Sequence, residues 1–181
     1  RNAKGNITVL QVITHQAGYP NAVVGPDAWA DRKRLREVVC EFPLEWSPGS
    51  KVHYHGQSAH WTLGVLIEAL TGKDFRDVIR ETVCEKLGLG KELYVGLPES
   101  EFGRAADMHE PLPAGGGSGP LADNNSAAWR KSGAPGAGGY ATARAMAALY
   151  QMMLNGGELA GIRIVSPRLL QYAIRNHTGD R

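Results

Sequence analysis

Residues 46–72 read WSPGSKVHYHGQSAHWTLGVLIEALTG, and this stretch contains the clearest helix of the chain. The turn-like run SPGS precedes a short segment with three histidines and a tyrosine. A helix is then predicted from Ser58, as its N-cap, to a stop at Gly72. Apolar side chains occupy nearly every face of this helix, which is typical of a helix buried on all sides rather than of an amphipathic one.

Shorter helices are predicted before and after it. Residues 27–40 and 74–88 each carry apolar side chains at helical spacing, and Asp74 is a plausible N-cap for the second of these helices. Thr8 is predicted to cap a further short helix close to the start of the chain.

The second half of the sequence differs from the first in composition. Residues 96–139 are rich in Gly, Pro, Ser and Asn, so a long irregular segment is expected there. A helix capped by Thr142, a short strand at 161–165 and a last helix opened by Ser166 and Pro167 are predicted to follow.

The composition fits a single globular domain spanning residues 1–181. Apolar residues make up 43% and charged residues 21% of the chain, and the net charge is +2. The one basic run, RKRLR at 32–36, is interpreted as a solvated helix face, so no nucleic-acid partner is predicted. No membrane partner is predicted either, because no stretch approaches the roughly 18 apolar residues of a membrane helix. The start, RNAKGNITVL, lacks the apolar region of a signal peptide, and the compartment stays unknown.

Three segments carry a resemblance to a known family. They read ITVLQVITHQAGYP at 7–20, WSPGSKVHYHGQSAHWTLGVLIEALTGKDFRDVIRETVCEKLGL at 46–89, and GAPGAGGYATARAMAALYQMMLNGGEL at 133–159. In order and spacing they resemble the serine β-lactamase and penicillin-binding-protein-like family, especially its esterase branch. Together they cover well over half of the chain.

The resemblance implies a mechanism of acyl transfer. In this family a serine of an S-x-x-K motif attacks an ester or amide carbonyl. The lysine of that motif and a tyrosine of a second motif move protons, and a third motif, K-T-G or H-x-G, helps to bind the substrate. A hydroxyl is a weak nucleophile that needs a nearby base, and the oxyanion that forms needs positioned hydrogen-bond donors.

The second motif places three candidate site residues. Tyr54 aligns with the family's tyrosine and is predicted to be catalytic; a phenol, with an ordinary pKa of about 10, acts as a base only beside positive charge. His55 and Gly56 are predicted to bind substrate. Gly56 stands where the family has Asn, whose amide contacts the substrate amide in the β-lactamase branch, so the sequence favours ester over β-lactam chemistry.

Two motifs of the family are absent from the sequence. No serine has a lysine three residues later, and the HTG at 177–179 is interpreted as a helix-exit turn because it directly follows a helix. We therefore expect the central part of a larger enzyme: a mainly α chain with few short strands, equivalent to the helical lobe of a β-lactamase-like serine hydrolase (an α/β sandwich plus an all-α lobe). By itself it is predicted to be inactive and to self-associate through an uncovered lobe face.

The histidines also raise the alternative of a zinc site. His53 and His55 are two residues apart in a segment expected to be extended, and their side chains are expected to point in opposite directions. No Asp, Glu or Cys falls within 52–61, so no metal and no cofactor is predicted. His60 is predicted to be a core or supporting residue of the buried helix, and His15 to close the turn in which it lies.

Two hypotheses about function stay open. In the first, the intact protein is a carboxylesterase that forms an acyl-serine intermediate on a small ester or acyl substrate, with its nucleophile outside this chain; transfer to an alcohol would use the same residues. In the second, the protein is an inactive family member that serves as a binding or interaction module. A third, an unrelated all-α domain, requires the three matches to be coincidental.

Overall fold

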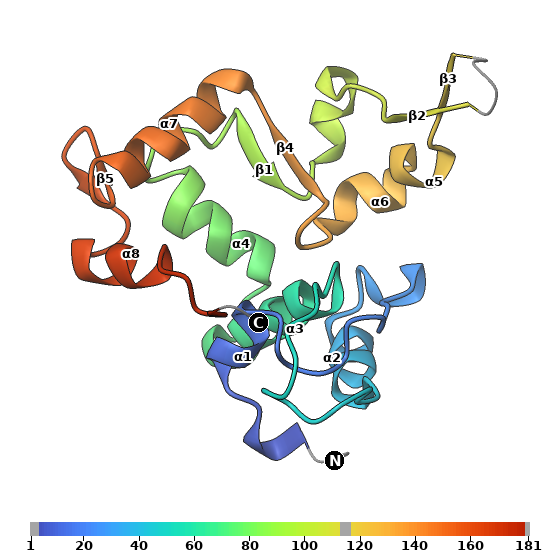
Figure 1. Cartoon of the computed structure of the whole chain (residues 1–181). Coiled ribbons are helices and arrows are strands. Elements are labelled where there is room, and N and C mark those ends of the chain that lie inside the picture. Colours follow the sequence, from blue (N-terminus) through green and yellow to red (C-terminus); the bar gives the residue numbers. More distant parts are fainter. Residues whose placement is uncertain (1–3, 113–116, 180–181) are drawn as a thin grey trace.

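The helix predicted after the histidine-rich segment is present as α3 (Ser58–Thr71), but it is not buried on all sides as predicted: Trp61 and Val65 are buried, whereas Leu70 is 78% exposed. The structure is a computed structural model that describes residues 4–112 and 117–179; the PAGG run at 113–116, within the predicted irregular segment, lies outside them. Helices α1 (Val9–Ile13), α2 (Arg32–Glu41) and α4 (Phe75–Ile79) all pack on α3 (Figure 1). The Trp61 side chain of α3 is fully buried among them.

Side-chain caps fix where most of these helices begin. Thr8 forms a reciprocal capping box with Gln11, and Asp74 accepts a backbone N–H at the start of α4, as predicted. Asp31 caps α2, which therefore begins after the separate 3₁₀ turn η2 (Pro26–Ala28) and not at residue 27. The prediction for Ser58 is wrong, because its hydroxyl donates to the Tyr19 carbonyl at 2.8 Å and caps no helix.

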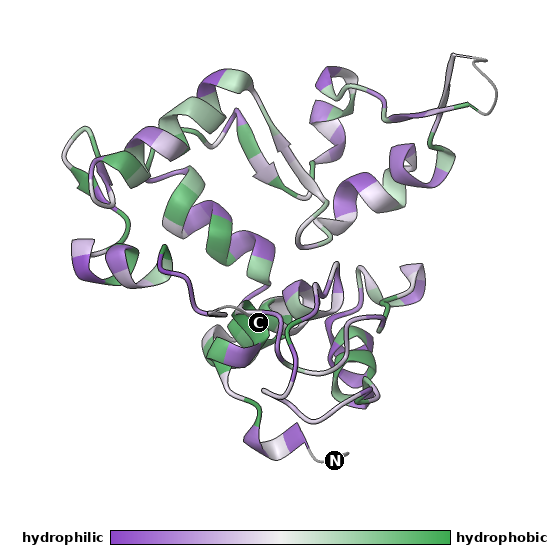
Figure 2. Ribbon diagram, in the orientation of Figure 1, coloured by the Kyte–Doolittle hydropathy of each residue, from purple (hydrophilic) through white to green (hydrophobic). Residues whose placement is uncertain are grey.

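The chain after α4 forms the second half of the molecule, drawn above α3 in Figure 1. Helix α4 continues as a π-helical turn, η3 (Arg80–Cys84), into β1 (Leu93–Val95). This strand pairs antiparallel with β4 (Gly139–Ala141), with Tyr94 opposite Tyr140. Hydrophobic and hydrophilic residues are interspersed along the helix formed by α4 and η3 (Figure 2).

Short elements fill the sequence between and after these two strands. Before β4 come η4 (Glu99–Arg104), β2 (His109–Pro111), β3 (Ser118–Pro120), α5 (Ala122–Asn125) and α6 (Ala127–Ser132). After it come α7 (Ala143–Leu154), β5 (Glu158–Leu159), β6 (Ile162–Arg163) and α8 (Pro167–Ala173), while η1 (Lys4–Asn6) starts the described chain. Within the described residues, no helix has the length and hydropathy that crossing a bilayer requires.

One arginine ties the two halves together. The Arg76 guanidinium of α4 donates to the carbonyls of Trp29, at 2.5 Å, and Ser132, at 2.7 Å, and pairs with Asp74. The rings of Trp29 and Trp129 meet edge to face beside these contacts, with centroids 5.2 Å apart. These contacts hold the third matched segment, which follows α6, against α3.

The prediction of a mainly α helical lobe is wrong as a statement of fold class. Helices account for 47% and strands for 9% of the structure, so the predicted predominance of helix with few short strands is roughly right, but a fold class of helices alone leaves out the paired strands. The described strands pair into three separate two-stranded antiparallel sheets. Each strand has two or three residues, which is too short for the alternating pattern by which strands are recognised in a sequence.

Candidate functional site

The first and second matched segments run side by side and place Tyr54 at the surface. The backbone N–H groups of Glu45, Gly49 and His53 donate to the carbonyls of Gly18, Gln16 and His15 at 2.7, 2.8 and 3.1 Å. Gly18 is required at this junction, because it has a φ of +92° and a Cβ there would lie 2.5 Å from the Trp46 carbonyl oxygen. The turn at 14–19 therefore supports the segment that carries the tyrosine.

His55, predicted to contact substrate, is fully buried and fully hydrogen-bonded within the protein. Its Nε2 accepts the backbone N–H groups of Gly18 and Tyr19 at 3.1 and 3.2 Å, and its Nδ1 lies 2.5 Å from the His53 carbonyl. Nδ1 therefore carries the proton of a neutral ring. Burial lowers the pKa of His55, and the His53 carbonyl opposes this shift only in part. The ring joins the two segments beneath Tyr54.

Tyr54 points outward, with 67% of its side chain exposed. Its ring lies against that of His15, with centroids 4.8 Å apart. Gly56 leaves the space next to the phenol open: a Cβ there would meet Tyr54 Cε1 at 3.6 Å, an ordinary van der Waals contact. The arrangement offers an accessible phenol on a backbone that is hydrogen-bonded on both sides.

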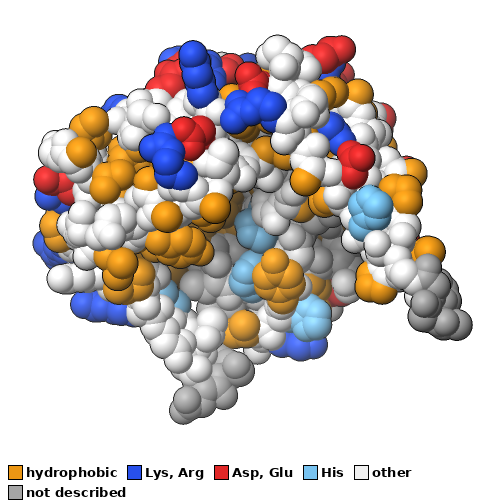
Figure 3. Space-filling model, turned by 90° about the horizontal axis from the view of Figure 1, so that it is seen from above, with side chains coloured by type: hydrophobic (Ala, Val, Ile, Leu, Met, Phe, Trp, Pro, Cys, Tyr) orange, Lys and Arg blue, Asp and Glu red, His pale blue; other side chains and the backbone are white. Residues whose placement is uncertain are grey.

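The third family segment contacts the histidine rings near Tyr54 through Gly136. This glycine has a φ of +89° and lies on the His60 ring, where a Cβ would come within 3.0 Å of His60 Nδ1. The His60 ring in turn meets the His15 ring edge to face, at 5.9 Å between centroids. The sequence predicted none of these contacts, because they depend on tertiary packing between distant segments. In Figure 3 histidine side chains gather in a hollow on this face, next to hydrophobic side chains.

The geometry of the histidines is that of packed rings. The His53 and His55 rings both meet Trp46, at 5.7 and 6.3 Å between centroids, so the expectation that these two side chains point in opposite directions is wrong; residues two apart in an extended segment lie on the same face. Within residues 4–112 and 117–179, no three His, Cys, Asp or Glu side chains are placed to hold a metal ion.

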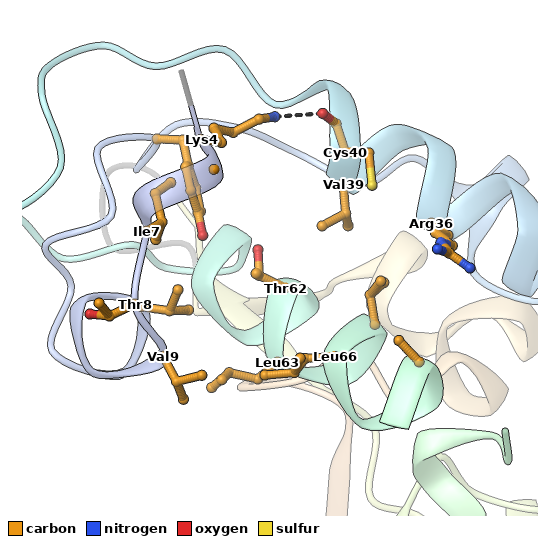
Figure 4. A pocket seen from close by; sticks show the side chains of 15 residues that line it. Lys4, Ile7, Thr8, Val9, Arg36, Val39, Cys40, Thr62, Leu63 and Leu66 are labelled. Carbon is orange, nitrogen blue, oxygen red and sulfur yellow. Dashed lines mark hydrogen bonds between the residues drawn. The ribbon is translucent and has the colours of Figure 1, made fainter. Parts of the chain in front are cut away.

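A cavity of about 660 Å³ lies elsewhere, between η1, α1, α2 and α3 (Figure 4). Its walls are mostly apolar, and Lys4 at its edge donates to the Cys40 carbonyl at 2.6 Å. Tyr54, His15 and His60 are not among its lining residues, so this cavity is separate from the place where the three family segments meet. Cys40, which also lines the cavity, is exposed, whereas Cys84 lies outside it and is buried, and burial raises the pKa of its thiol.

The HTG at 177–179 forms a turn after α8. Thr178 and Gly179 donate their backbone N–H groups to the Asn176 side chain, and the His177 ring lies 2.7 Å from the Tyr172 carbonyl. This agrees with a helix-exit turn and not with a substrate-binding strand.

Comparison with known proteins gives the family. A sequence model described as Beta-lactamase matches residues 1–179. The chain belongs to the Beta-lactamase family. The resemblance carried by the three segments is thereby confirmed, and family membership makes the chain part of a β-lactamase-like serine hydrolase group with esterase and penicillin-binding-protein-like members.

Individual family members are similar over almost the whole chain. The protein named Esterase/beta-lactamase LipL of Mycobacterium tuberculosis (strain ATCC 25618 / H37Rv) is 31% identical over 204 residues, which cover 97% of this chain and 46% of LipL. The crystal structure of a family VIII carboxylesterase is 30% identical, with a TM-score of 0.78 over 92% of this chain and 48% of that protein. A penicillin-binding protein homologue from Caulobacter crescentus is 27% identical, with a TM-score of 0.72 over 94% of this chain and 49% of its own.

These matches complete the correction of the fold class. The structural neighbours are β-lactamase-fold proteins, and that fold replaces the mainly α assignment. The chain spans about half the length of the relatives it matches.

Proposed function

We propose that this chain provides Tyr54 and its surroundings to a serine carboxylesterase that acts through an acyl-serine intermediate. The observation that carries the proposal is the exposed phenol of Tyr54 at the place where all three family segments meet. LipL is named as an esterase and β-lactamase, and the family VIII protein is a carboxylesterase, which supports ester hydrolysis here.

The nucleophile in this proposal comes from outside the 181 residues. No serine of the chain has the lysine that the family motif requires three residues later. The serine oxygen attacks the ester carbonyl, its proton passes to the lysine or the Tyr54 oxygen, and the leaving alcohol takes a proton back as the acyl-serine forms. Water, or a second alcohol, then releases the acyl group by the same steps in reverse order.

The other two predicted site residues take different parts in this scheme. His55 makes its ring hydrogen bonds within the protein, so we assign it to holding the Tyr54 segment in place rather than to the substrate itself. Gly56 leaves room beside the phenol and offers no side-chain amide, which favours small esters over amides as substrates.

The alternative, an inactive binding module, has one observation in its favour, the absence of S-x-x-K from these residues. Intact-mass analysis of the protein made from the complete reading frame, after treatment with a serine-directed fluorophosphonate, separates the two. The carboxylesterase predicts one adduct, on a serine of an S-x-x-K motif outside residues 1–181, and no adduct on the 181-residue chain alone. Absence of any adduct would establish the binding module, and an adduct on a serine within the chain would refute the role given to Tyr54.

A further inference from the structure

His15 holds a backbone conformation that few residues other than glycine adopt. Its φ is +58°, in the left-handed region, where Asn, Asp and His are the non-glycine residues most often found. Such a conformation costs free energy and persists only where the surrounding contacts impose it. At His15 several of the surrounding contacts lead to Tyr54 and its two neighbours in the sequence.

Two hydrogen bonds join His15 to the residues on either side of Tyr54. The His53 N–H donates to the His15 carbonyl at 3.1 Å, and the His55 N–H donates to His15 Nδ1 at 3.2 Å. The left-handed turn lets the carbonyl and the ring nitrogen of one residue face the same extended segment. The residues before and after Tyr54 are therefore both anchored to His15.

The ring of His15 adds a third contact, because it lies against the phenol itself at 4.8 Å. A phenol with 67% of its surface exposed gains little fixation from packing, so its orientation depends on its backbone and on this neighbour. Since His15 Nδ1 accepts a hydrogen bond, the neutral ring carries its proton on Nε2. Burial, and then the nearby His60 and His55 rings, lower the pKa of His15 and so favour this neutral form.

We propose that His15 is the positioning residue of Tyr54, acting mainly through its two hydrogen bonds to the flanking peptides. This inference rests on the proposed function, in which Tyr54 moves protons, and adds to it the residue that sets where the phenol oxygen lies. Proton transfer is sensitive to such placement: a displacement of about 1 Å at a reacting group costs on the order of 100-fold in rate.

Three variants separate the parts of this arrangement. His15→Ala removes the ring acceptor and the ring contact. His15→Asn keeps a residue that tolerates the left-handed backbone and places its Oδ1 where Nδ1 was, so it retains the acceptor and removes only the ring. His53→Ala is the matched control, because this exposed ring faces Trp46 while the backbone groups at residue 53 stay unchanged.

Kinetics and amide exchange give the test. In the protein from the complete reading frame we expect His15→Ala to lower kcat about 10- to 100-fold with KM within about twofold, and His15→Asn to recover kcat to within about threefold of the parent. In the 181-residue chain, amide hydrogen exchange at residue 55 should accelerate in His15→Ala and stay slow in His15→Asn. His53→Ala should match the parent in both measurements.

The outcomes of this test distinguish the positioning role from the proposed function. A folded His15→Ala with unchanged kcat, beside a Tyr54→Phe variant that has lost activity, overturns positioning by His15 and leaves the role of Tyr54 intact. Unchanged exchange at residue 55 in His15→Ala overturns the hydrogen-bonded anchor whatever the kinetics show. A fully active Tyr54→Phe overturns the proposed function, and positioning for catalysis with it.

Discussion

The phenol ring of Tyr54 packs against the imidazole of His15, with 4.8 Å between the centroids and 55° between the planes. The two residues come from different family segments, separated in the sequence by α2. The hydrogen bonds from the His53 and His55 amides to His15 bring them together. An exposed phenol is thereby carried by a backbone segment that is hydrogen-bonded on both sides of it.

Removing the Tyr54 hydroxyl should abolish most of the activity without affecting the fold. In the protein from the complete reading frame, we expect Tyr54→Phe to lower kcat for a p-nitrophenyl ester by about 10²- to 10⁴-fold, the usual contribution of a positioned acid or base. The side chain is mostly exposed, so the free energy of unfolding should change by less than about 0.5 kcal/mol.

Tyr150→Phe is the matched control for this substitution. Tyr150 lies on α7 and is 60% exposed, similar to Tyr54, but it is far from the histidine rings in the sequence and is not part of the proposed site. Equal activity of Tyr54→Phe and Tyr150→Phe would remove Tyr54 from the mechanism.

Gly56 offers a test of the ester preference. The position has room for a side chain, since a Cβ would make only an ordinary contact with the Tyr54 ring. We expect Gly56→Asn to raise the ratio of β-lactam to ester turnover by about 2- to 10-fold, the equivalent of one added hydrogen bond. Nitrocefin and a p-nitrophenyl ester give the two rates in parallel assays.

Gly56→Ala is the control, because it fills the same space without an amide. An equal rise in that variant would show that side-chain volume, and not the amide, sets the substrate preference. A fall in the melting temperature of both variants would contradict the open space seen beside Tyr54.

The buried histidines predict how stability depends on pH. The pKa values of His15 and His55 are lowered in the folded protein, mainly by burial, whereas both return to about 6.5 on unfolding. Below that pH the unfolded chain binds more protons than the folded one, so the stability present above pH 6.5 is lost as the pH falls further. We expect the melting temperature to drop between pH 7 and pH 5.

A variant without one of these rings tests the cause of that drop. His55→Gln should be less stable at pH 8 by about 1–3 kcal/mol, because the N–H groups of Gly18 and Tyr19 lose a well-placed acceptor. It should also lose less stability between pH 7 and pH 5 than the parent. The pKa values of Glu92 and Glu99 are lowered by their partners Arg144 and Lys131, so these carboxylates titrate below this window. An identical pH dependence in His55→Gln would exclude His55 as its source.

The sequence predicts the local parts of this fold well. Caps such as Thr8, Asp74, Thr142 and Ser166 act over one helical turn, so the residues that form them are adjacent in the sequence. The extent of α3 is equally local, but its apolar side chains do not fix its burial, since Leu70 is exposed whereas Trp61 is buried. Pairings between distant segments are not local: β1 meets β4 across a long stretch of chain, and strands of three residues carry too little pattern to predict it.

The candidate site, too, is predicted from the sequence only where the signal is local. The family resemblance places Tyr54, whose catalytic role stays a prediction, but nothing in a linear motif says that the next side chain turns inward to hold Gly18 and Tyr19. His55 follows the alternation of an extended segment, so its direction is fixed by which face the turn at 14–19 covers. The contact of Gly136 with His60 likewise depends on tertiary packing and has no signal in either segment.

A last prediction concerns Gly138, where the third segment folds tightly back on itself. A Cβ at this position would lie 2.4 Å from the Ala134 nitrogen and 2.7 Å from the Gly133 carbonyl carbon, both backbone atoms that cannot rotate away. The residue also donates its N–H to the Ala134 carbonyl at 2.6 Å and accepts from Gly96 at 3.0 Å. We expect Gly138→Ala to destabilise the protein by about 1–3 kcal/mol or more, as overpacking does.

The neighbouring Gly139 is the matched control, because the nearest atom to its Cβ position is 3.8 Å away and its φ is not left-handed. Gly139→Ala should be neutral, or more stable by up to about 1 kcal/mol through a less flexible unfolded chain. Urea denaturation of the two variants measures both values, and equal stabilities would mean that the backbone does not approach Gly138 this closely.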